Sequence, residues 1–417
     1  MFILATGCGS DSAAPSRGTE GSGSSARAEA PRISYDPPRT FSESAVSLPK
    51  EAGFGKSGGD MWGSRLVGSP PVTLRGTQAY VASPYDLQIV DTGNGRVTTI
   101  RPEHDSPRSA QVGPSEEIAG PPLVSDTGVG VLVIVPFAVR IPGSGTTPDS
   151  HVLEMAAVDT DSAAVKWRAV LQLPKWTSKA YGNIGVRMVG SQADVAVVRV
   201  SNYENETAVA VNLRTHRVLW QKDFLPTAVL GTTVSGLERN LSETHLKAFD
   251  LATGEPTWAI EEGSYNATAS SAGPNLLQYS GQIYENGKFF ARFLDAHTGK
   301  VINEIQGVKD VTCAYDGKSV TVCSGGASHS ECAFAVDAQT GKLLWQLPDR
   351  AANRIAPEIT AAWNGRAYGT TVNGPIALDA RTGADVKVSP GMAPVLVNGY
   401  TGLTVKGRTV TAHRTTS

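Results

Sequence analysis

The sequence predicts an all-β protein, and three observations carry this prediction. The 44 Gly and 25 Pro among 417 residues indicate many turns. Short runs with alternating apolar residues, such as Ala193–Val200 and Ser319–Cys323, are typical of strands. A motif recurs about every 40 residues, which is the period of four-stranded propeller blades. Together they predict a β-propeller of four-stranded blades, with eight blades preferred and seven as the alternative.

The recurring motif consists of an Asp, a Thr-Gly three and four residues later, and a Trp eight residues later. Its clearest copies begin at Asp250 and Asp337. The later copies lie 38 to 45 residues apart, and the longer intervals before them indicate inserted loops. The residues assigned to this structural repeat are Asp91, Asp159, Trp167, Asn212, Trp220, Asp250, Gly254, Trp258, Asp295, Gly299, Asp337, Gly341, Trp345, Asp379 and Gly383.

Each residue of the motif has a structural role. The Asp can accept hydrogen bonds from backbone N–H groups inside a turn, and the Gly permits a positive φ there. An Ala two residues before the Asp, as at Ala248 and Ala335, leaves room for a bulky neighbour. The Trp follows on the next strand, where it can cover small residues and donate its indole N–H. The motif therefore predicts a strand, a tight turn and a second strand.

The chain after Asp379 contains one more set of strand-like runs, which extends to the C-terminus. These runs predict a further blade that is closed by a strand from the N-terminal side, near Ala45–Leu48. The expected organisation is a signal-peptide remnant at 1–8, a disordered tether at 9–40 and a single propeller domain at 41–417.

The motif resembles the hallmark of the pyrroloquinoline-quinone-type propeller repeat family, Ala-x-Asp-x-x-Thr-Gly-x-x-x-Trp. The resemblance extends from about residue 60 to the C-terminus and implies the propeller fold. The sequence is also similar to the family of propeller lipoproteins of the outer-membrane barrel-assembly machinery. That similarity implies a scaffold that works by contacting partner proteins.

The resemblance also raises an enzymatic alternative, a quinoprotein dehydrogenase that binds pyrroloquinoline quinone (PQQ). Enzymes of that family carry a vicinal Cys-Cys pair, a calcium site and a Trp floor under the cofactor. This sequence contains no Cys-Cys dipeptide, and most of its seven Trp residues belong to the repeat. No metal-ligand spacing, nucleophile elbow or phosphate-binding loop is present either. We expect no catalytic residues, no metal and no PQQ.

The N-terminal segment Ala5-Thr6-Gly7-Cys8 resembles the lipobox of a bacterial lipoprotein, in which the cysteine is lipidated. Residues 9–32 contain no large apolar residue, which is typical of a flexible tether. The basic start of a signal peptide is missing, so either the true start lies upstream of Met1 or the match arises by chance. The expected location is the extracytoplasmic face of the bacterial cell membrane, with the lipid on Cys8.

The three remaining cysteines lie within one short stretch of the chain. Cys323 and Cys332 flank the loop SGGASHSE and are expected to face each other across a hairpin. A tight turn at Asp316-Gly317 would place Cys313 opposite Val320. We therefore predict a Cys323–Cys332 disulfide with Cys313 as a buried thiol, and three reduced cysteines if the protein is cytosolic.

Inserted loops at 101–121, 141–150 and 174–182 are the candidates for binding, because loops on a rigid scaffold carry most binding residues. The last contains Trp176 and Tyr181, which would suit a binding loop. His104, with Glu103 and Asp105, is the one polar cluster outside the repeat and is interpreted as a solvated loop.

The formal net charge of −2 and the pI of about 6.4 do not show the excess of basic residues that is typical of nucleic-acid-binding proteins. We expect a non-catalytic extracytoplasmic lipoprotein that is a scaffold for protein or peptide binding at the cell surface. The alternatives are the quinoprotein dehydrogenase and an extracellular sensor or carbohydrate-binding propeller. Partner identity and oligomeric state stay open.

Overall fold

The structure is a computed structural model, and it separates two compact units, Met1–Ile33 and Ser34–Ser417. The residues that it describes are 32–56, 70–104, 119–126, 130–178, 184–202, 204–240, 243–327, 330–387 and 389–417. Cys8 and most of the expected tether lie outside these residues. Within the described part, no helix is long and apolar enough to cross a membrane.

Strands dominate the unit from Ser34 to Ser417. Its first half contains β1 (Phe41–Ser47), β2 (Val72–Arg75), β3 (Gln78–Ala82), β4 (Leu87–Asp91), β5 (Val97–Ile100), β6 (Leu123–Asp126), β7 (Val131–Ile141), β8 (Ser150–Asp159), β9 (Val165–Gln172), β10 (Gly185–Gln192), β11 (Val195–Ser201), β12 (Glu206–Asn212), β13 (Arg217–Lys222), β14 (Leu225–Leu230), β15 (Thr233–Arg239), β16 (Thr244–Asp250) and β17 (Pro256–Ala259). Two short 3₁₀ helices, η1 (Lys50–Lys56) and η3 (Lys175–Ser178), interrupt the strands.

In the second half, all elements found among the described residues are strands. They are β18 (Ser264–Ser271), β19 (Leu276–Ile283), β20 (Phe289–Asp295), β21 (Val301–Gln306), β22 (Lys309–Tyr315), β23 (Val320–Ala327), β24 (Ser330–Asp337), β25 (Leu343–Leu347), β26 (Glu358–Trp363), β27 (Arg366–Thr371), β28 (Gly374–Asp379), β29 (Asp385–Lys387), β30 (Leu396–Val397), β31 (Thr401–Lys406) and β32 (Thr409–Thr415).

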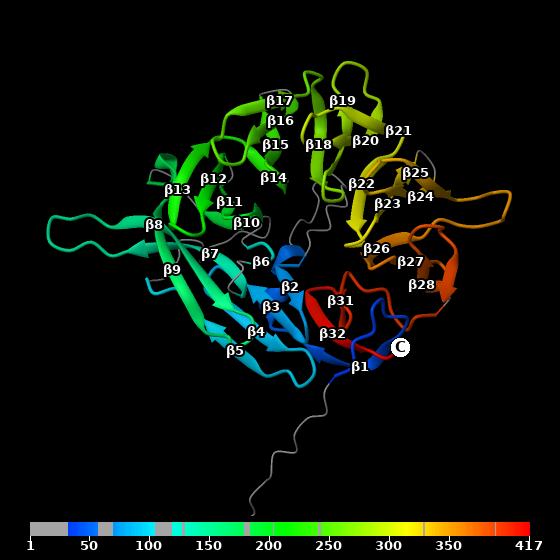
Figure 1. Cartoon of the computed structure of the whole chain (residues 1–417), viewed down its shortest axis with the longest axis horizontal. Helices are drawn as coiled ribbons and strands as arrows, with labels where there is room; N and C mark the ends of the chain where they lie inside the picture. Colours follow the sequence, from blue (N-terminus) through cyan, green and yellow to red (C-terminus); the bar gives the residue numbers. More distant parts are fainter. Residues whose placement is uncertain are drawn as a thin grey trace, which may run out of the picture. The chain divides into compact units, whose positions relative to one another are not determined.

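Consecutive strands pair antiparallel into seven sheets in the described residues, six of four strands and one of eight. The sheets of the Ser34–Ser417 unit follow one another around a common centre, and the first strands of successive sheets, such as β6, β10 and β14, contact each other (Figure 1). The all-β propeller prediction is confirmed. The eight-stranded sheet consists of β14–β17 and β18–β21, joined at the pair Thr244↔Ser264. The count of eight blades therefore stays a prediction.

The last sheet joins the two ends of the unit. Its strand order is β1-β32-β31-β30, so β1 adds to the C-terminal strands. Ala45, Val46 and Ser47 pair with His413, Ala412 and Thr411, and the sequence had indicated this closing strand at Ala45–Leu48. Because β1 comes from the other end of the chain, the first and last elements hold the sheets together.

The core lies between the sheets rather than at one central point. Ile134 and Met155 of the sheet β6–β9 pack in one cluster with Met188 and Val198 of the sheet β10–β13. Both faces of a blade are therefore apolar, and each sheet stabilises its neighbours.

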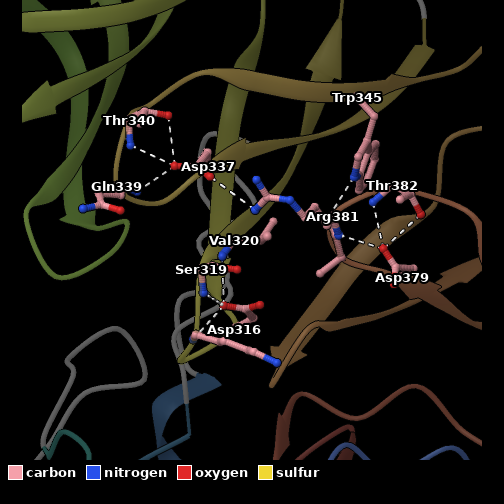
Figure 2. A network of polar contacts seen from close by, with 12 residues as sticks. Asp316, Ser319, Val320, Asp337, Gln339, Thr340, Trp345, Asp379, Arg381 and Thr382 are labelled. Atoms are coloured by element: carbon pink, nitrogen blue, oxygen red, sulfur yellow. Dashed lines mark hydrogen bonds and ion pairs between the residues drawn. The ribbon is translucent and has the colours of Figure 1, made fainter.

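The repeat turns show why the motif recurs. In the turn after β16, the Asp250 Oδ1 atom accepts the backbone N–H groups of Ala252 (3.0 Å) and Thr253 (2.8 Å), and Gly254 has φ +73°. The turns at Asp337 and Asp379 repeat this arrangement (Figure 2). These carboxylates cap turns, as their recurrence at one position of the motif predicts.

The motif Trp connects each sheet to the next one. Trp258 lies opposite Ala248 on the neighbouring strand and donates from Nε1 to the Ala296 carbonyl of the next turn (3.1 Å). Trp220 and Trp345 make the equivalent bonds at 2.9 and 2.8 Å, to Leu251 and Ala380. Each of these three indoles covers the Gly of the next repeat turn, so a Cβ added at Gly299 would lie 2.6 Å from the Trp258 ring.

Two copies of the motif depart from its residue pattern, but each keeps the contact between the Trp position of one copy and the turn of the next. The turn at Asn212 has His216 in place of Gly, with φ +56°, and its ring stacks on Trp167 at a centroid distance of 4.4 Å. The copy at Asp295 has Asn303 in place of Trp, and Asn303 Nδ2 donates to the Gly341 carbonyl (3.0 Å). The sequence analysis missed Asn303, although it lies eight residues after the anchor.

The predicted Cys323–Cys332 disulfide is wrong. Cys313 and Cys323 form the disulfide, with their Cα atoms 4.1 Å apart, and Cys332 is a buried free thiol. The prediction assumed a two-residue turn at Asp316-Gly317, but the loop runs through four residues and Tyr315 pairs with Thr321. Cys313 is consequently opposite Cys323.

The next hairpin explains why Cys332 has no disulfide partner. The loop SGGASHSE is mostly strand, because β23 extends to Ala327, which pairs with Ser330. That register places Cys332 opposite Gly325 and Phe334 opposite Cys323. Burial raises the pKa of the Cys332 thiol.

Candidate functional site

The meander topology creates two rims. In each sheet the first-to-second and third-to-fourth connections lie at one rim, which carries the repeat turns. The second-to-third connections and the links between sheets lie at the opposite rim, called here the loop rim. The described parts of all three predicted binding loops adjoin the sheet β6–β9 on the loop rim: 101–104 and 119–121 precede β6, 141–150 joins β7 to β8, and 174–178 follows β9.

The structure brings two of these loops together around a pocket. The β7–β8 hairpin, which projects at the left of Figure 1, forms one side, and the segment with η3 forms the other. The pocket is lined by Arg140, Pro148, Asp149, Ser150, His151, Val152, Gln172, Leu173, Pro174, Lys175, Thr177 and Ser178. Buried Val152 and Leu173 provide apolar surface, and polar side chains of both charges surround it.

The hairpin wall of this pocket is held by polar contacts. Arg140 Nη1 lies 3.1 Å from Asp149 Oδ2, and the backbone N–H of Gly143 donates to Asp149 Oδ1 at 2.8 Å. The Gly143 bond is the main reason that the pKa of Asp149 lies below its usual value. A Cβ at Gly143 would lie 2.1 Å from the Thr147 carbonyl oxygen, so the tight hairpin tip requires glycine there.

Trp176 supports the other wall. Its Nε1 donates to Thr207 Oγ1 (2.9 Å), and that hydroxyl donates to Asp223 (2.7 Å). The indole is half-buried against the core between the sheets β6–β9 and β10–β13. It thus fastens η3 to the next sheet, and its direct role in binding stays a prediction. Tyr181 lies outside the described residues.

The interpretation of His104 as a solvated loop residue is wrong. Its Nδ1 lies 2.9 Å from a carboxylate oxygen of Glu154, whose side chain is completely buried. The backbone N–H of Glu103 (2.8 Å) and Arg168 Nη1 (2.8 Å) donate to the same carboxylate. Asp105 lies outside the described residues. The cluster fastens the beginning of the 101–121 loop to β8.

Burial alone would raise the pKa of Glu154. The backbone N–H groups of Glu103 and His104, the His104 ring and the Arg168 guanidinium together hold that pKa below its usual value. A carboxylate so fully paired is a structural anchor more than a reactive group.

Metal and catalytic constellations were sought in the same residues. Across the described ranges, no group of three His, Cys, Asp or Glu side chains could hold a metal ion. The indoles of Trp220, Trp258 and Trp345 cover turn residues of the next sheet, so they are engaged in packing between blades.

These features define a class, the repeat propellers with Asp-capped turns, Trp contacts between blades and inserted loops on one rim. The chain belongs to the family described as outer membrane protein assembly factor BamB, whose family model matches residues 149–416. A comparison with curated proteins finds no match.

Several solved structures are similar to this chain. BamB from Moraxella catarrhalis is 13% identical, with 90% of this chain and 99% of that chain covered and a TM-score of 0.48. The Dos1 propeller is 12% identical, with coverage of 79% and 85% and a TM-score of 0.45. A europium-containing methanol dehydrogenase is 12% identical, with coverage of 80% and 80% and a TM-score of 0.40. None of these values carries an argument about function.

Proposed function

We propose that this chain is a non-catalytic scaffold that binds protein or peptide partners at its loop rim. The observation that carries the proposal is the pocket beside the sheet β6–β9, which is lined by the β7–β8 hairpin and by the segment with η3. Membership of the BamB family supports a scaffold role. Loops held on a rigid framework are the usual location of binding residues.

The character of the pocket suits a peptide. Its buried apolar side chains can receive a side chain of the partner, and Gln172 and Ser150 can bond to a partner's backbone. The walls are fastened by Trp176 and by the Gly143–Asp149 contact, so little ordering accompanies binding. Pre-organisation of this kind favours affinity.

We also propose that the protein binds no quinone cofactor. Support comes from the repeat Trp residues, whose rings pack on turn glycines such as Gly254 and Gly299. The quinoprotein dehydrogenase alternative predicts the absorbance of a bound quinone in the purified protein. A quinone spectrum with matching dehydrogenase activity would contradict the scaffold proposal.

We also propose attachment to the extracytoplasmic membrane face through a lipid on Cys8. The Cys313–Cys323 disulfide supports an oxidising compartment. The test is membrane fractionation and intact mass of the native protein, with a start extended upstream, beside Cys8→Ala. Loss of both the lipid mass and membrane attachment in the variant is expected, whereas an unmodified wild type contradicts the anchor.

Binding is tested by site-specific photo-crosslinking in the native host. A crosslinking residue replaces Lys175 on the pocket wall, and the matched control replaces Gln339, an exposed residue of a repeat turn. Crosslinks are expected from position 175 alone. The captured partner is then purified and titrated against the wild type and His151→Ala with Lys175→Ala, with about fivefold weaker binding expected. Crosslinks from position 339 alone would contradict the proposed rim.

A further inference from the structure

Two exposed tyrosines stack on the loop rim of the blade β18–β21, away from the pocket. The ring centroids of Tyr265 and Tyr284 lie 4.7 Å apart at an interplanar angle of 35°. Their exposed fractions are 40% and 38%. The backbone N–H of Tyr284 donates to the Gly263 carbonyl (2.9 Å), which fixes the β19–β20 turn beside the start of β18.

A third aromatic ring extends this surface. Tyr265 pairs with Gln282 on β19, and Gln282 pairs with Phe289 on β20, so the three side chains share one face of the sheet. Phe289 is also 38% exposed. Isolated exposed apolar residues are ordinary, but here Tyr265 and Phe289 flank Gln282 on one sheet face and Tyr284 stacks on Tyr265, which indicates an interaction surface.

One carboxylate, that of Glu243, lies close enough to Tyr265 to influence its titration. Glu243 approaches Gly263 so closely that a Cβ there would collide with its carboxylate. The hydrogen bond that the Tyr265 hydroxyl donates to Tyr284, partial burial and the charges of Tyr284 and Glu243 together raise the pKa of Tyr265. Glu261 and Glu285 are exposed on the two adjoining segments. The tyrosine patch is defined here as Glu243, Glu261, Tyr265, Tyr284 and Glu285.

The charges of the patch are unbalanced. Elsewhere on these sheets carboxylates have cationic partners: Arg292 pairs with Glu262 and Glu304, and Lys247 pairs with Glu238. Within the described residues, Glu243 has a possible ion-pair partner only in His245, at 3.5 Å, and neither Glu261 nor Glu285 has one. Stacked rings beside unpaired carboxylates form the chemical environment that a cation prefers.

We propose that the tyrosine patch binds the guanidinium or ammonium group of a basic segment in a partner protein. The cation would lie over a tyrosine ring face and pair with Glu243 or Glu285, while Phe289 contacts the side-chain stem. This proposal rests on the proposed function, because it supplies a second contact for a partner held at the loop rim. Charge complementarity selects the basic segment over a neutral glycan, which could use the same rings.

The test measures binding of short capped peptides by calorimetry with the full chain. The probes are a peptide of alternating Gly and Arg, its Gly/Glu counterpart and the oligosaccharide chitohexaose. We expect the Gly/Arg peptide alone to bind, with lower affinity at higher salt. Tyr265→Ala with Tyr284→Ala should weaken binding about tenfold, and Glu243→Gln about threefold. The double Tyr→Phe variant should stay within about threefold of the wild type because it keeps the rings.

The matched control is Tyr85→Ala. Tyr85 is 39% exposed on the same rim, in the β3–β4 turn, and its replacement should leave the affinity unchanged. Unchanged binding by the double Ala variant, equal binding of the Gly/Glu peptide, or binding of chitohexaose alone would overturn the inference. If the crosslinked partner still depends on the Lys175 pocket while the tyrosine variants bind normally, the proposed function stands and this inference fails.

Discussion

At the residue scale, the repeat motif acts through two kinds of contact, both at the rim opposite the loops. The Asp carboxylate satisfies backbone N–H groups that would otherwise lose hydrogen bonds in the turn. The turn Gly provides both a positive φ and a flat surface for the Trp of the preceding sheet. Arg381 adds an ion pair to Asp337 at 3.3 Å across the same boundary (Figure 2).

Replacing Gly299 by Ala should destabilise the protein by about 3 kcal/mol. The positive φ of +71° alone costs about 1 kcal/mol for a residue with a Cβ, and the new methyl also collides with Trp258. The matched control is Gly317→Ala, at φ +75° with no atom within 4 Å, where about 1 kcal/mol is expected. Urea unfolding measures both values. Equal losses would show that the Trp258 contact contributes nothing.

Replacing Glu154 by Gln should remove about 2 kcal/mol of stability at neutral pH, because a buried charge-assisted cluster is broken. The pKa of Glu154 is lowered in the folded chain. Its contribution is therefore present above the unfolded value of about 4.3 and is lost as the pH falls through the folded pKa.

The free energies of unfolding of the wild type and Glu154→Gln should accordingly converge in acid. The control is Glu103→Gln, whose exposed carboxylate also pairs with Arg168 but should cost less than about 0.5 kcal/mol. A difference between wild type and Glu154→Gln that persists unchanged below about pH 3 would rule out this linkage.

At the element scale, the strands with partners distant in sequence hold the fold together. The strand β1 pairs with β32 and packs its inner residues against the cluster that contains Val72, Leu403 and Ala412. Similarly, η3 is fastened to β12 through Trp176 and Thr207, and the 101–121 loop to β8 through Glu154. These contacts determine where the loop-rim pocket is placed.

Two substitutions in β1 test whether this strand closes the propeller. Val46 is half-buried on the inner side of β1, and its neighbour Ala45 points outward. Val46→Asp should cost about 3 kcal/mol because it places a charge against apolar side chains, while Ala45→Asp should change stability by less than about 0.5 kcal/mol. Thermal unfolding followed by circular dichroism measures both. Equal melting temperatures for the two variants would mean that β1 does not close the propeller.

At the scale of the whole molecule, the two rims have different roles. One rim carries short repeat turns that lock neighbouring sheets, so it tolerates little variation. The other carries the insertions, the pocket and the tyrosine patch, where length and sequence can vary without loss of the core. This division follows from the antiparallel meander, because the connections between the second and third strands and between successive sheets all lie on one side.

Much of this architecture could be predicted from the chain alone. The motif at Asp250 and Asp337 predicted the turns and the propeller, because those features depend on local chemistry repeated at a fixed interval. The strand-like runs after Asp379 predicted the closing strand. The disulfide could not be predicted correctly, because it depends on the length of one loop. The four-residue loop at Asp316 sets the register of β22 and β23 so that Cys313, and not Cys332, is the disulfide partner of Cys323. The environment of His104 was also missed, since Glu154 lies 50 residues away.

The sequence by itself therefore determined the fold class, the repeat and the positions of the insertions, since turn chemistry and strand periodicity are local properties. Only the tertiary structure decided which side chains meet: Trp176 with Thr207, His104 with Glu154, and Tyr265 with Tyr284. Such contacts depend on strand register and on packing between sheets, and a change of one residue in a loop shifts the register of its hairpin.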